Sequence, residues 1–222
     1  MNEKIIAIGD VHGYYHTLIS LLQKLNVDFE KDKVIFLGDY IDRGKYPLKT
    51  VLAIEDLNVK HPQNVICLKG NHEDMCCRYY FNGDRMWSWN GYERSFQEIE
   101  SYENKDLLLD WMNSLPIKYE TENYCFCHSG NWSTDKIPDY DVVQCLWDRD
   151  WLKYGLSNNC DREKPIIFGH TPHFEPTYYD ENICIDTGIC YPNKGCGKLT
   201  AAILDSSHPV EFVTVDASQK DL

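Results

Sequence analysis

Short apolar runs recur along the chain, and each is followed within two residues by glycine, aspartate, asparagine or histidine. They occupy residues 5–8, 34–37, 65–68, 124–127, 166–168 and 183–185. These runs lack polar alternation, which is typical of strands that are buried on both faces of a sheet. Residues 198–204 and 210–215, on either side of a Ser-Ser-His-Pro turn, are predicted to be two closing strands.

Helical patterns separate the first strands. In residues 15–25 the apolar positions lie three and four residues apart, at Leu18, Leu21, Leu22 and Leu25. Pro47 suits the first turn of a second helix over residues 47–57, and a third helix is predicted from about residue 70 to 80. This alternation predicts a β-α-β-α-β opening with parallel strands and right-handed crossovers.

The alternation of predicted strands and helices is interrupted at residues 82–115. We interpret this segment as a cap or insert with a helix at 105–115. Further along, 141–147 is predicted to be a short helix, and 216–222 is predicted to be a frayed end. No linker, repeat or low-complexity tract divides the chain. Residues 1–222 are therefore predicted to form a single domain.

The chain is acidic, with 35 acidic and 22 basic side chains and a formal charge of −13 over 222 residues. This balance disfavours a broad surface for nucleic acid or for an anionic membrane. No apolar run approaches the ~20 residues that cross a bilayer, and the N-terminus lacks the apolar stretch of a signal peptide. We expect a cytoplasmic protein with no long nucleic acid or membrane partner. Its ten cysteines are expected to be reduced, since none forms a Cys-x-x-Cys pair.

Side chains that can bind metals gather where the predicted strands end: Asp10, His12, Asp39, Asn71, His128 and His170. A single Gly-Asp pair is usually only a turn, but the recurrence at five strand ends favours a functional site. Open α/β sheets bind ligands outside the carboxyl ends of their strands. The mixed nitrogen and oxygen donors, without thiolate, suit Mn²⁺, Fe²⁺ or Zn²⁺ better than Ca²⁺ or Cu⁺. These donors suffice for two ions if one carboxylate bridges them.

Three segments carry a family resemblance: Gly9-Asp-Val-His-Gly13, Gly38-Asp-Tyr-Ile-Asp-Arg-Gly44 and Gly70-Asn-His-Glu73. They resemble the signature blocks of the phosphoprotein phosphatase family of calcineurin-like metallophosphoesterases. The later blocks of that family are similar to His128-Ser-Gly130, Gly169-His-Thr-Pro172 and Ile185-Asp-Thr-Gly188. The short chain and Leu146-Trp-Asp-Arg149 most resemble the bacterial and phage-lambda branch, so a bacterial source is expected.

This resemblance implies an α/β fold in which a central β-sandwich of mixed sheets is flanked by helices, an α/β/β/α arrangement. It also implies two divalent metal ions, with Mn²⁺ as the first candidate and Fe²⁺ or Zn²⁺ as alternatives. The implied ligands are Asp10 and His12 for the first ion, Asp39 as the bridge, and Asn71, His128 and His170 for the second ion.

The resemblance further implies roles around the phosphate. His72 would be the general acid, oriented by Asp42, while Arg43, Arg149 and Asn71 would hold the phosphate. Two ions about 3.5–4 Å apart lower the pKa of a bridging water, so a metal-bridging hydroxide would attack in line. Arginine offers a planar fork to two phosphoryl oxygens. An alkoxide leaves poorly, so the acid is worth roughly 10²–10⁴-fold in rate.

These features predict a phosphomonoesterase of the serine/threonine protein phosphatase type, with activity on phosphotyrosine left open. The alternative is a symmetrical dinucleoside tetraphosphatase or another small-molecule phosphohydrolase. That branch usually has Ala-Arg-Gly and Asn-His-Asp where this chain has Asp42-Arg43-Gly44 and Asn71-His72-Glu73. A binding module without catalysis is disfavoured, because every implied ligand and the acid are present. The substrate could be a phosphoprotein or a small phosphoester, and the oligomeric state is left open.

Two features of the sequence bear on access to such a site. The ions together with Arg43 and Arg149 would make the pocket positive, so the net charge of −13 does not exclude an anionic substrate. Four aromatic residues lie in the predicted cap: Trp87, Trp89, Tyr92 and Phe96. They could form a rim over the metals, or pack on one another as a local support.

Overall fold

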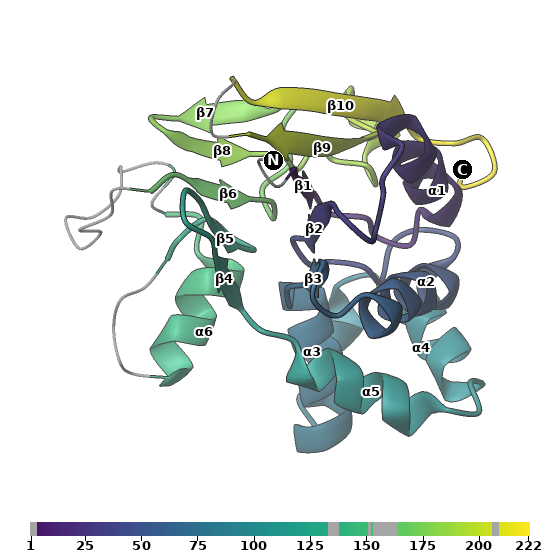
Figure 1. Cartoon of the computed structure of the whole chain (residues 1–222). Helices are drawn as coiled ribbons and strands as arrows, with labels where there is room; N and C mark the ends of the chain where they lie inside the picture. Colours follow the sequence, from purple (N-terminus) through teal and green to yellow (C-terminus); the bar gives the residue numbers. More distant parts are fainter. Residues whose placement is uncertain (1–3, 133–137, 151, 153–163, 206–208) are drawn as a thin grey trace.

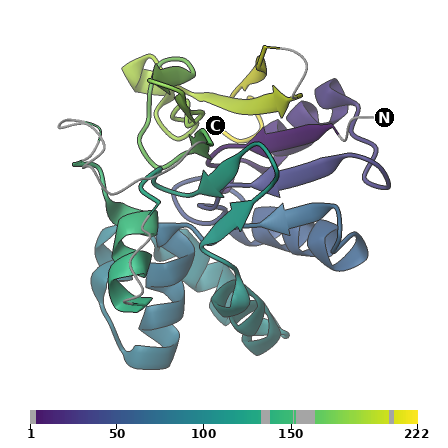
Figure 2. The same cartoon turned by 60° about the vertical axis from the view of Figure 1, so that its left-hand side comes forward.

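The computed structural model describes residues 4–132, 138–150, 152, 164–205 and 209–222. Two five-stranded sheets lie face to face, with helices outside them (Figure 1). In Figure 2 the strands β4 and β5 come forward and stand in front of the first sheet. The mixed α/β architecture implied by the family resemblance is confirmed.

The first sheet has the strand order β10-β9-β1-β2-β3. Its strands are β1 (Ile5–Ile8), β2 (Lys33–Phe36), β3 (Val65–Cys67), β9 (Lys198–Leu204) and β10 (Glu211–Asp216). Strands β1, β2 and β3 are parallel, with Ile6 opposite Val34 and Ile35 opposite Ile66. Strand β9 pairs antiparallel with β1 and closes the sheet together with β10.

The second sheet has the order β4-β5-β6-β8-β7. Its strands are β4 (Lys118–Glu120), β5 (Cys125–Cys127), β6 (Ile166–Phe168), β7 (Thr177–Tyr179) and β8 (Asn182–Cys184). Strands β5, β6 and β8 are parallel, while β4 and β7 pair antiparallel at the two edges. The carboxyl ends of the parallel strands therefore meet at one end of each sheet, as predicted.

Helices cover the outer faces of the sandwich (Figure 1). They are α1 (Tyr15–Leu25), α2 (Pro47–Lys60), α3 (Asn71–Asn82), α4 (Glu93–Glu100), α5 (Lys105–Ser114) and α6 (Pro138–Trp147), with short 3-10 turns η1 (Met86–Trp89) and η2 (Pro192–Lys194). Helices α1 to α5 lie on the side of the first sheet, and α6 lies beside β4 and β5. Among the described residues, no helix combines the length and apolar character that a bilayer crossing needs.

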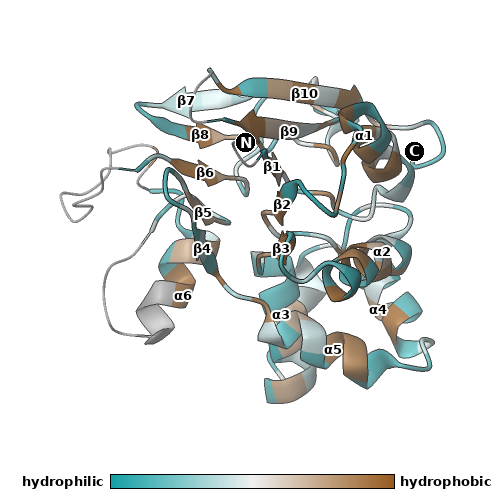
Figure 3. Cartoon of the chain, in the orientation of Figure 1, coloured by the Kyte–Doolittle hydropathy of each residue, from teal (hydrophilic) through white to brown (hydrophobic). Residues whose placement is uncertain are grey.

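The strand side chains alternate between two apolar layers. On β1, Ile6 and Ile8 pack towards α1 and α2, whereas Ala7 packs between the sheets with Ile35 and Phe126. This is the two-residue period of a strand whose faces are both covered. A third layer lies between the second sheet and α6 and includes several buried cysteines. Figure 3 shows apolar colouring on many of the strands and on parts of the helices, whereas the edge strands β4 and β7 are coloured hydrophilic to neutral.

The C-terminal residues 216–222 were predicted to fray, and this prediction is wrong. Helix α1 begins after Tyr14 without a side-chain cap of its own. The Asp221 carboxylate, 3% exposed, supplies that cap by accepting hydrogen bonds from the Thr17 amide at 2.7 Å and the Thr17 hydroxyl at 2.6 Å. The His16 amide donates to its other oxygen at 3.1 Å. An anion at a helix N-terminus is stabilising, so the tail is held in place.

Replacing Asp221 with alanine is therefore expected to destabilise the protein by about 1 kcal/mol, the typical cost of losing a helix cap. For a chain of this length that lowers Tm by roughly 2–4 °C. Thermal unfolding followed by circular dichroism measures the shift. Lys220→Ala, next to it on the exposed tail, is the control and should leave Tm unchanged. Equal Tm values for wild type and Asp221→Ala would show that the tail contributes nothing.

Candidate metal centre and phosphate-binding site

The loops after five parallel strands meet at one end of the sandwich. They bring together the six side chains predicted as metal ligands, and all six are buried: Asp10, His12, Asp39, Asn71, His128 and His170. Strand β1 leads into the first two, β2 into Asp39, β3 into Asn71, β5 into His128, and β6 into His170. The fold therefore assembles these residues from positions up to 160 residues apart in the chain.

The predicted ligands of the second ion converge on one point. Asn71 Oδ1 lies 2.9 Å from His128 Nε2 and 3.0 Å from His170 Nδ1. The two imidazole nitrogens are 3.1 Å apart, and Asp39 Oδ1 lies 3.4 Å from His128 Nε2. The His170 Nε2 atom is buried and has no hydrogen-bond partner among the described residues. Four donor atoms at such distances form a pocket suited to a single cation.

The other ring nitrogens set which atoms face the pocket. His128 Nδ1 lies 2.8 Å from the Leu37 carbonyl, and His12 Nδ1 lies 3.0 Å from the Ile41 carbonyl. A carbonyl accepts only from an N–H, so in both rings Nδ1 carries the proton and Nε2 presents a lone pair to the site. Backbone carbonyls commonly fix metal-binding imidazoles in this way.

Asp39 lies between two groups of donor atoms. Its Oδ1 faces His128, while its Oδ2 is 3.5 Å from His12 Nε2 and 3.9 Å from His72 Nε2. A carboxylate with one oxygen on each side has the arrangement that bridging requires. The Asp10 carboxylate accepts a hydrogen bond from the His170 amide at 3.1 Å.

The charges of these buried groups are unevenly compensated. Burial, reinforced by Asp186, raises the pKa of Asp10 well above its usual value, and burial lowers the pKa of His12 to about 3. Burial also disfavours the charged form of His128, but Asp39 outweighs it and raises the pKa of His128 to about 9. These carboxylates and imidazoles compete for protons. A divalent cation bound among them favours the anionic form of the carboxylates and the neutral form of the imidazoles.

The loop that holds Asp39 is fastened by Glu73. Its carboxylate accepts hydrogen bonds from the amides of Asp39 and Tyr40 at 2.8 Å and from the amide of Gly70 at 3.0 Å. These bonds hold Asp39 at a φ of 54°, a left-handed conformation that non-glycine residues rarely adopt. Gly70 is required by packing, since a Cβ there would lie 2.2 Å from Asp39 Oδ1.

His72 and Asp42 form a buried pair beside the metal ligands. His72 Nδ1 lies 2.6 Å from Asp42 Oδ2, and both side chains are at most 1% exposed. Burial disfavours a charge on His72, but Asp39 and Asp42 outweigh it and raise the pKa of His72. The other ring nitrogen, Nε2, faces the cavity, where Arg43 Nη2 lies 3.1 Å away.

The two predicted phosphate arginines border the same cavity, which has a volume of about 330 Å³. Arg149 Nη2 donates to the His170 carbonyl at 2.8 Å, which ties it to a predicted metal ligand. Arg43 contacts the Tyr191 hydroxyl. The cavity therefore combines five of the six predicted metal ligands with the His72 ring and both arginines.

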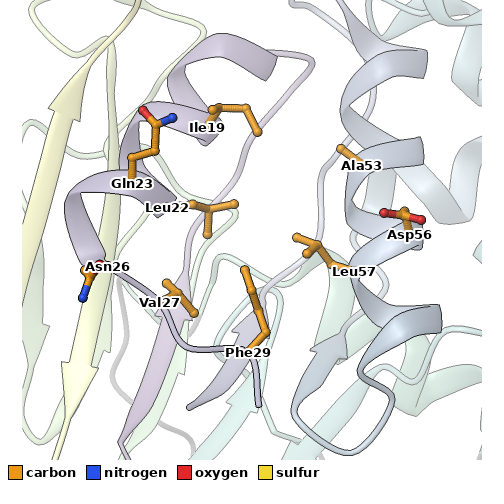
Figure 4. A pocket seen from close by; sticks show the side chains of 9 residues that line it. All are labelled: Ile19, Leu22, Gln23, Asn26, Val27, Phe29, Ala53, Asp56 and Leu57. Atoms are coloured by element: carbon orange, nitrogen blue, oxygen red, sulfur yellow. The ribbon is translucent and has the colours of Figure 1, made fainter. Parts of the chain in front are cut away.

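A larger hollow of about 530 Å³ lies between α1 and α2. Figure 4 shows Leu22, Phe29 and Leu57 in this hollow, whose lining is mostly hydrocarbon. Phe29 precedes β2 and Leu57 lies in the C-terminal part of α2, so this hollow lies at the end of the sheet opposite the metal ligands. Phosphate chemistry needs cationic and metal-binding groups, so it belongs to the smaller cavity.

Residues 3–194 match the family of calcineurin-like phosphoesterases. The chain belongs to this family. The resemblance inferred from the signature blocks is confirmed, and the protein is a phosphoester hydrolase.

Named relatives of this phosphoesterase include protein phosphatases. Serine/threonine-protein phosphatase 2 of Salmonella typhimurium is 31% identical over 195 residues, covering 83% of this chain and 87% of that protein. Serine/threonine-protein phosphatase T of Trypanosoma brucei brucei is 29% identical over 157 residues, covering 70% of this chain but only 31% of its own length. A solved structure named as a candidate diadenosine tetraphosphatase covers 99% of this chain and 96% of its own at a TM-score of 0.69 and 16% identity, a likeness of fold alone.

A calcineurin-like phosphoesterase implies a dinuclear divalent metal centre, and the residues present fit one. Two groups of ligand atoms each lie within 4.8 Å of one another: His12, Asp39 and His72 in one, and Asp39, His128 and His170 in the other. Both contain Asp39. Asp10 borders the cavity outside these two groups.

Four residues of this phosphoesterase site were not predicted from the sequence. Glu73 and Asp186 lie in signature blocks but received no role, and Tyr191 follows the last block. Trp87 was listed only as one of four aromatic residues, yet its indole Nε1 donates to Asp42 at 2.7 Å. No local spacing indicates that contact, because it joins residues 45 positions apart.

Proposed function

We propose that this phosphoesterase is a serine/threonine-type protein phosphatase that uses two divalent ions, with Mn²⁺ as the first candidate. The observation that carries the proposal is the His72–Asp42 pair, 2.6 Å apart and buried beside the ligand cluster. A phosphoserine leaves as an alkoxide, which needs a proton. A relative aligned over 87% of its own length is named a serine/threonine-protein phosphatase.

The proposed ligands divide between two positions. Asp10, His12 and Asp39 would hold the first ion, and Asn71, His128 and His170 would hold the second together with Asp39. When bound, the two ions activate water and polarise the phosphoryl oxygens. The donor set of carboxylate, amide and imidazole is compatible with Mn²⁺, Fe²⁺ or Zn²⁺.

The remaining side chains orient the phosphate and the leaving group. Arg43 and Arg149 approach the cavity from different elements and hold the phosphoryl oxygens. The Asn71 amide nitrogen donates to the same phosphate, because its Oδ1 faces His128 and His170. His72 donates a proton to the leaving oxygen, and Asp42 keeps its ring in place.

Hydrolysis of a symmetrical dinucleoside tetraphosphate is the second candidate, since one solved structure of this fold is named for that class of activity. A nucleotide leaving group is a weak base and needs little protonation. A buried acid held by a carboxylate at 2.6 Å is therefore of less use to that reaction. The His72–Asp42 pair favours the protein phosphatase.

Parallel assays with Mn²⁺ test the proposal. The purified protein is given phosphoserine peptides, phosphotyrosine peptides and diadenosine tetraphosphate, and kcat/KM is measured for each. We expect the phosphoserine peptides to exceed the tetraphosphate by at least about tenfold, equivalent to about 1.4 kcal/mol of transition-state stabilisation. A preference of that size for the tetraphosphate would replace this proposal by the second candidate.

A further inference from the structure

The cap segment that follows α3 returns to the predicted catalytic pair through Trp87. Its indole Nε1 donates to Asp42 Oδ2 at 2.7 Å. His72 Nδ1 lies 2.6 Å from the same oxygen. Trp87 and Asp42 are fully buried, and the other carboxylate oxygen, Asp42 Oδ1, has no hydrogen-bond partner in the described part of the chain. One carboxylate oxygen therefore receives both donors.

Two further contacts brace the turn that carries Asp42 and Arg43. Both residues have left-handed backbones, with φ values of 67° and 64°. The Asp42 amide donates to the Ser95 hydroxyl at 2.9 Å, and the Arg43 amide donates to the Gly91 carbonyl at 3.3 Å. Such conformations persist only where the surroundings enforce them. The segment from η1 to α4 provides that support.

The position of Trp87 is fixed by aromatic packing. Its ring centroid lies 5.6 Å from that of Tyr79, 6.0 Å from Tyr80 and 5.3 Å from Tyr92. By contrast, Trp89 is 82% exposed. Of the two interpretations of the aromatic segment, local support describes Trp87 and Tyr92. A rigid ring can aim a single N–H at a fixed atom, which a flexible polar side chain cannot do.

We propose that Trp87 is a positioning residue for the leaving-group proton. The terminal torsion of an aspartate is broad, so one hydrogen bond from His72 leaves the Asp42 carboxylate free to turn. The second bond, from the indole, fixes the oxygen that holds His72 Nδ1. His72 Nε2 is then aimed into the cavity. Trp87 itself touches neither the phosphate nor the ions. This inference rests on the proposed function, in which His72 supplies a proton to the leaving group.

Trp87→Phe tests the inference, because it keeps most of the ring packing and removes the N–H. Kinetics are measured on a phosphoserine peptide, whose alkoxide needs a proton, and on p-nitrophenyl phosphate, whose leaving group does not. We expect kcat on the peptide to fall about 10–100-fold, part of the 10²–10⁴-fold that a general acid supplies. On the aryl ester kcat should change less than about threefold, with KM unchanged on both substrates.

Trp111→Phe is the matched control. Its indole Nε1 also donates a hydrogen bond, to Asn58 Oδ1 at 3.0 Å, in a part-buried position away from the cavity. We expect this variant to match wild type on both substrates. Bound metal per chain is measured for all three proteins, and retained activity on the aryl ester shows that Trp87→Phe is folded.

The outcomes distinguish failure of the positioning role of Trp87 from failure of the proposed function. Equal losses on both substrates in Trp87→Phe, or no loss on either, would overturn the positioning role and leave the phosphatase assignment intact. A wild-type protein that hydrolyses neither ester would overturn the proposed function, and the role of Trp87 with it.

Discussion

Replacing His72 with asparagine is expected to lower kcat on phosphoserine peptides by about 10²–10⁴-fold, the usual contribution of a general acid. The alkoxide would then leave without a proton from the imidazole that Asp42 holds at 2.6 Å. On p-nitrophenyl phosphate the loss should be much smaller, because that leaving group is stable as an anion. Steady-state kinetics on both esters, together with bound metal per chain, measure the difference.

His61→Asn is a suitable control for this variant. His61 stacks on Phe29 at the end of α2, far from the metal ligands in the fold. Its replacement should leave the ratio of alkyl to aryl activity unchanged. If His72→Asn lost the same factor on both esters, or lost a metal ion, His72 would not be the acid. Its role would then be to support the metal centre, which its distance of 3.9 Å from Asp39 Oδ2 also permits.

Replacing Asp39 with asparagine is expected to weaken binding at both metal positions. Asp39 is the one residue common to both groups of ligand atoms. Loss of its negative charge should therefore lower the metal affinity of both positions. Changes in residues that merely support metal ligands cost 10–100-fold in metal affinity, and we expect about 100-fold or more here. Isothermal titration with Mn²⁺ and metal analysis after gel filtration give the stoichiometry and the affinities.

Asp180→Asn is the matched control for Asp39→Asn. Both aspartates have a φ of 54°, but Asp180 lies in the exposed turn between β7 and β8. The control therefore tests the same chemical change at the same φ value, and it should bind two ions like wild type. Two tight ions in Asp39→Asn would contradict the bridging role, whereas the loss of one ion alone would assign Asp39 to a single position.

The parts of the site that could be predicted from the sequence are those that depend on the order of residues within a short segment. Each predicted ligand follows an apolar strand, and the structure brings Asn71, His128 and His170 within 3.1 Å of one another. Parallel strands place their carboxyl ends together, so a residue's position relative to its own strand predicted where it would lie. The family blocks supported the same residues, and they implied the layered sandwich that is observed.

The parts that were missed depend on contacts between distant segments. The tail predicted to fray is held because Asp221 caps a helix that begins some 200 residues earlier. Glu73 lies within a signature block, but only the fold shows its carboxylate gathering the amides of Asp39, Tyr40 and Gly70. Neither an acidic tail nor an acidic residue in the first turn of a helix has a periodicity that would reveal its partner.

The sequence by itself indicated the strands and the candidate metal-binding side chains, because apolar periodicity and residue chemistry are properties of short segments. Its resemblance to the family's signature blocks indicated the class of reaction. Only the tertiary structure decided how those side chains are held. It placed the indole of Trp87 against Asp42, put the two oxygens of Asp39 between two groups of donors, and enclosed both arginines in one cavity. Such contacts join residues tens of positions apart, and their energies depend on distance and burial, which a chain acquires only when it folds.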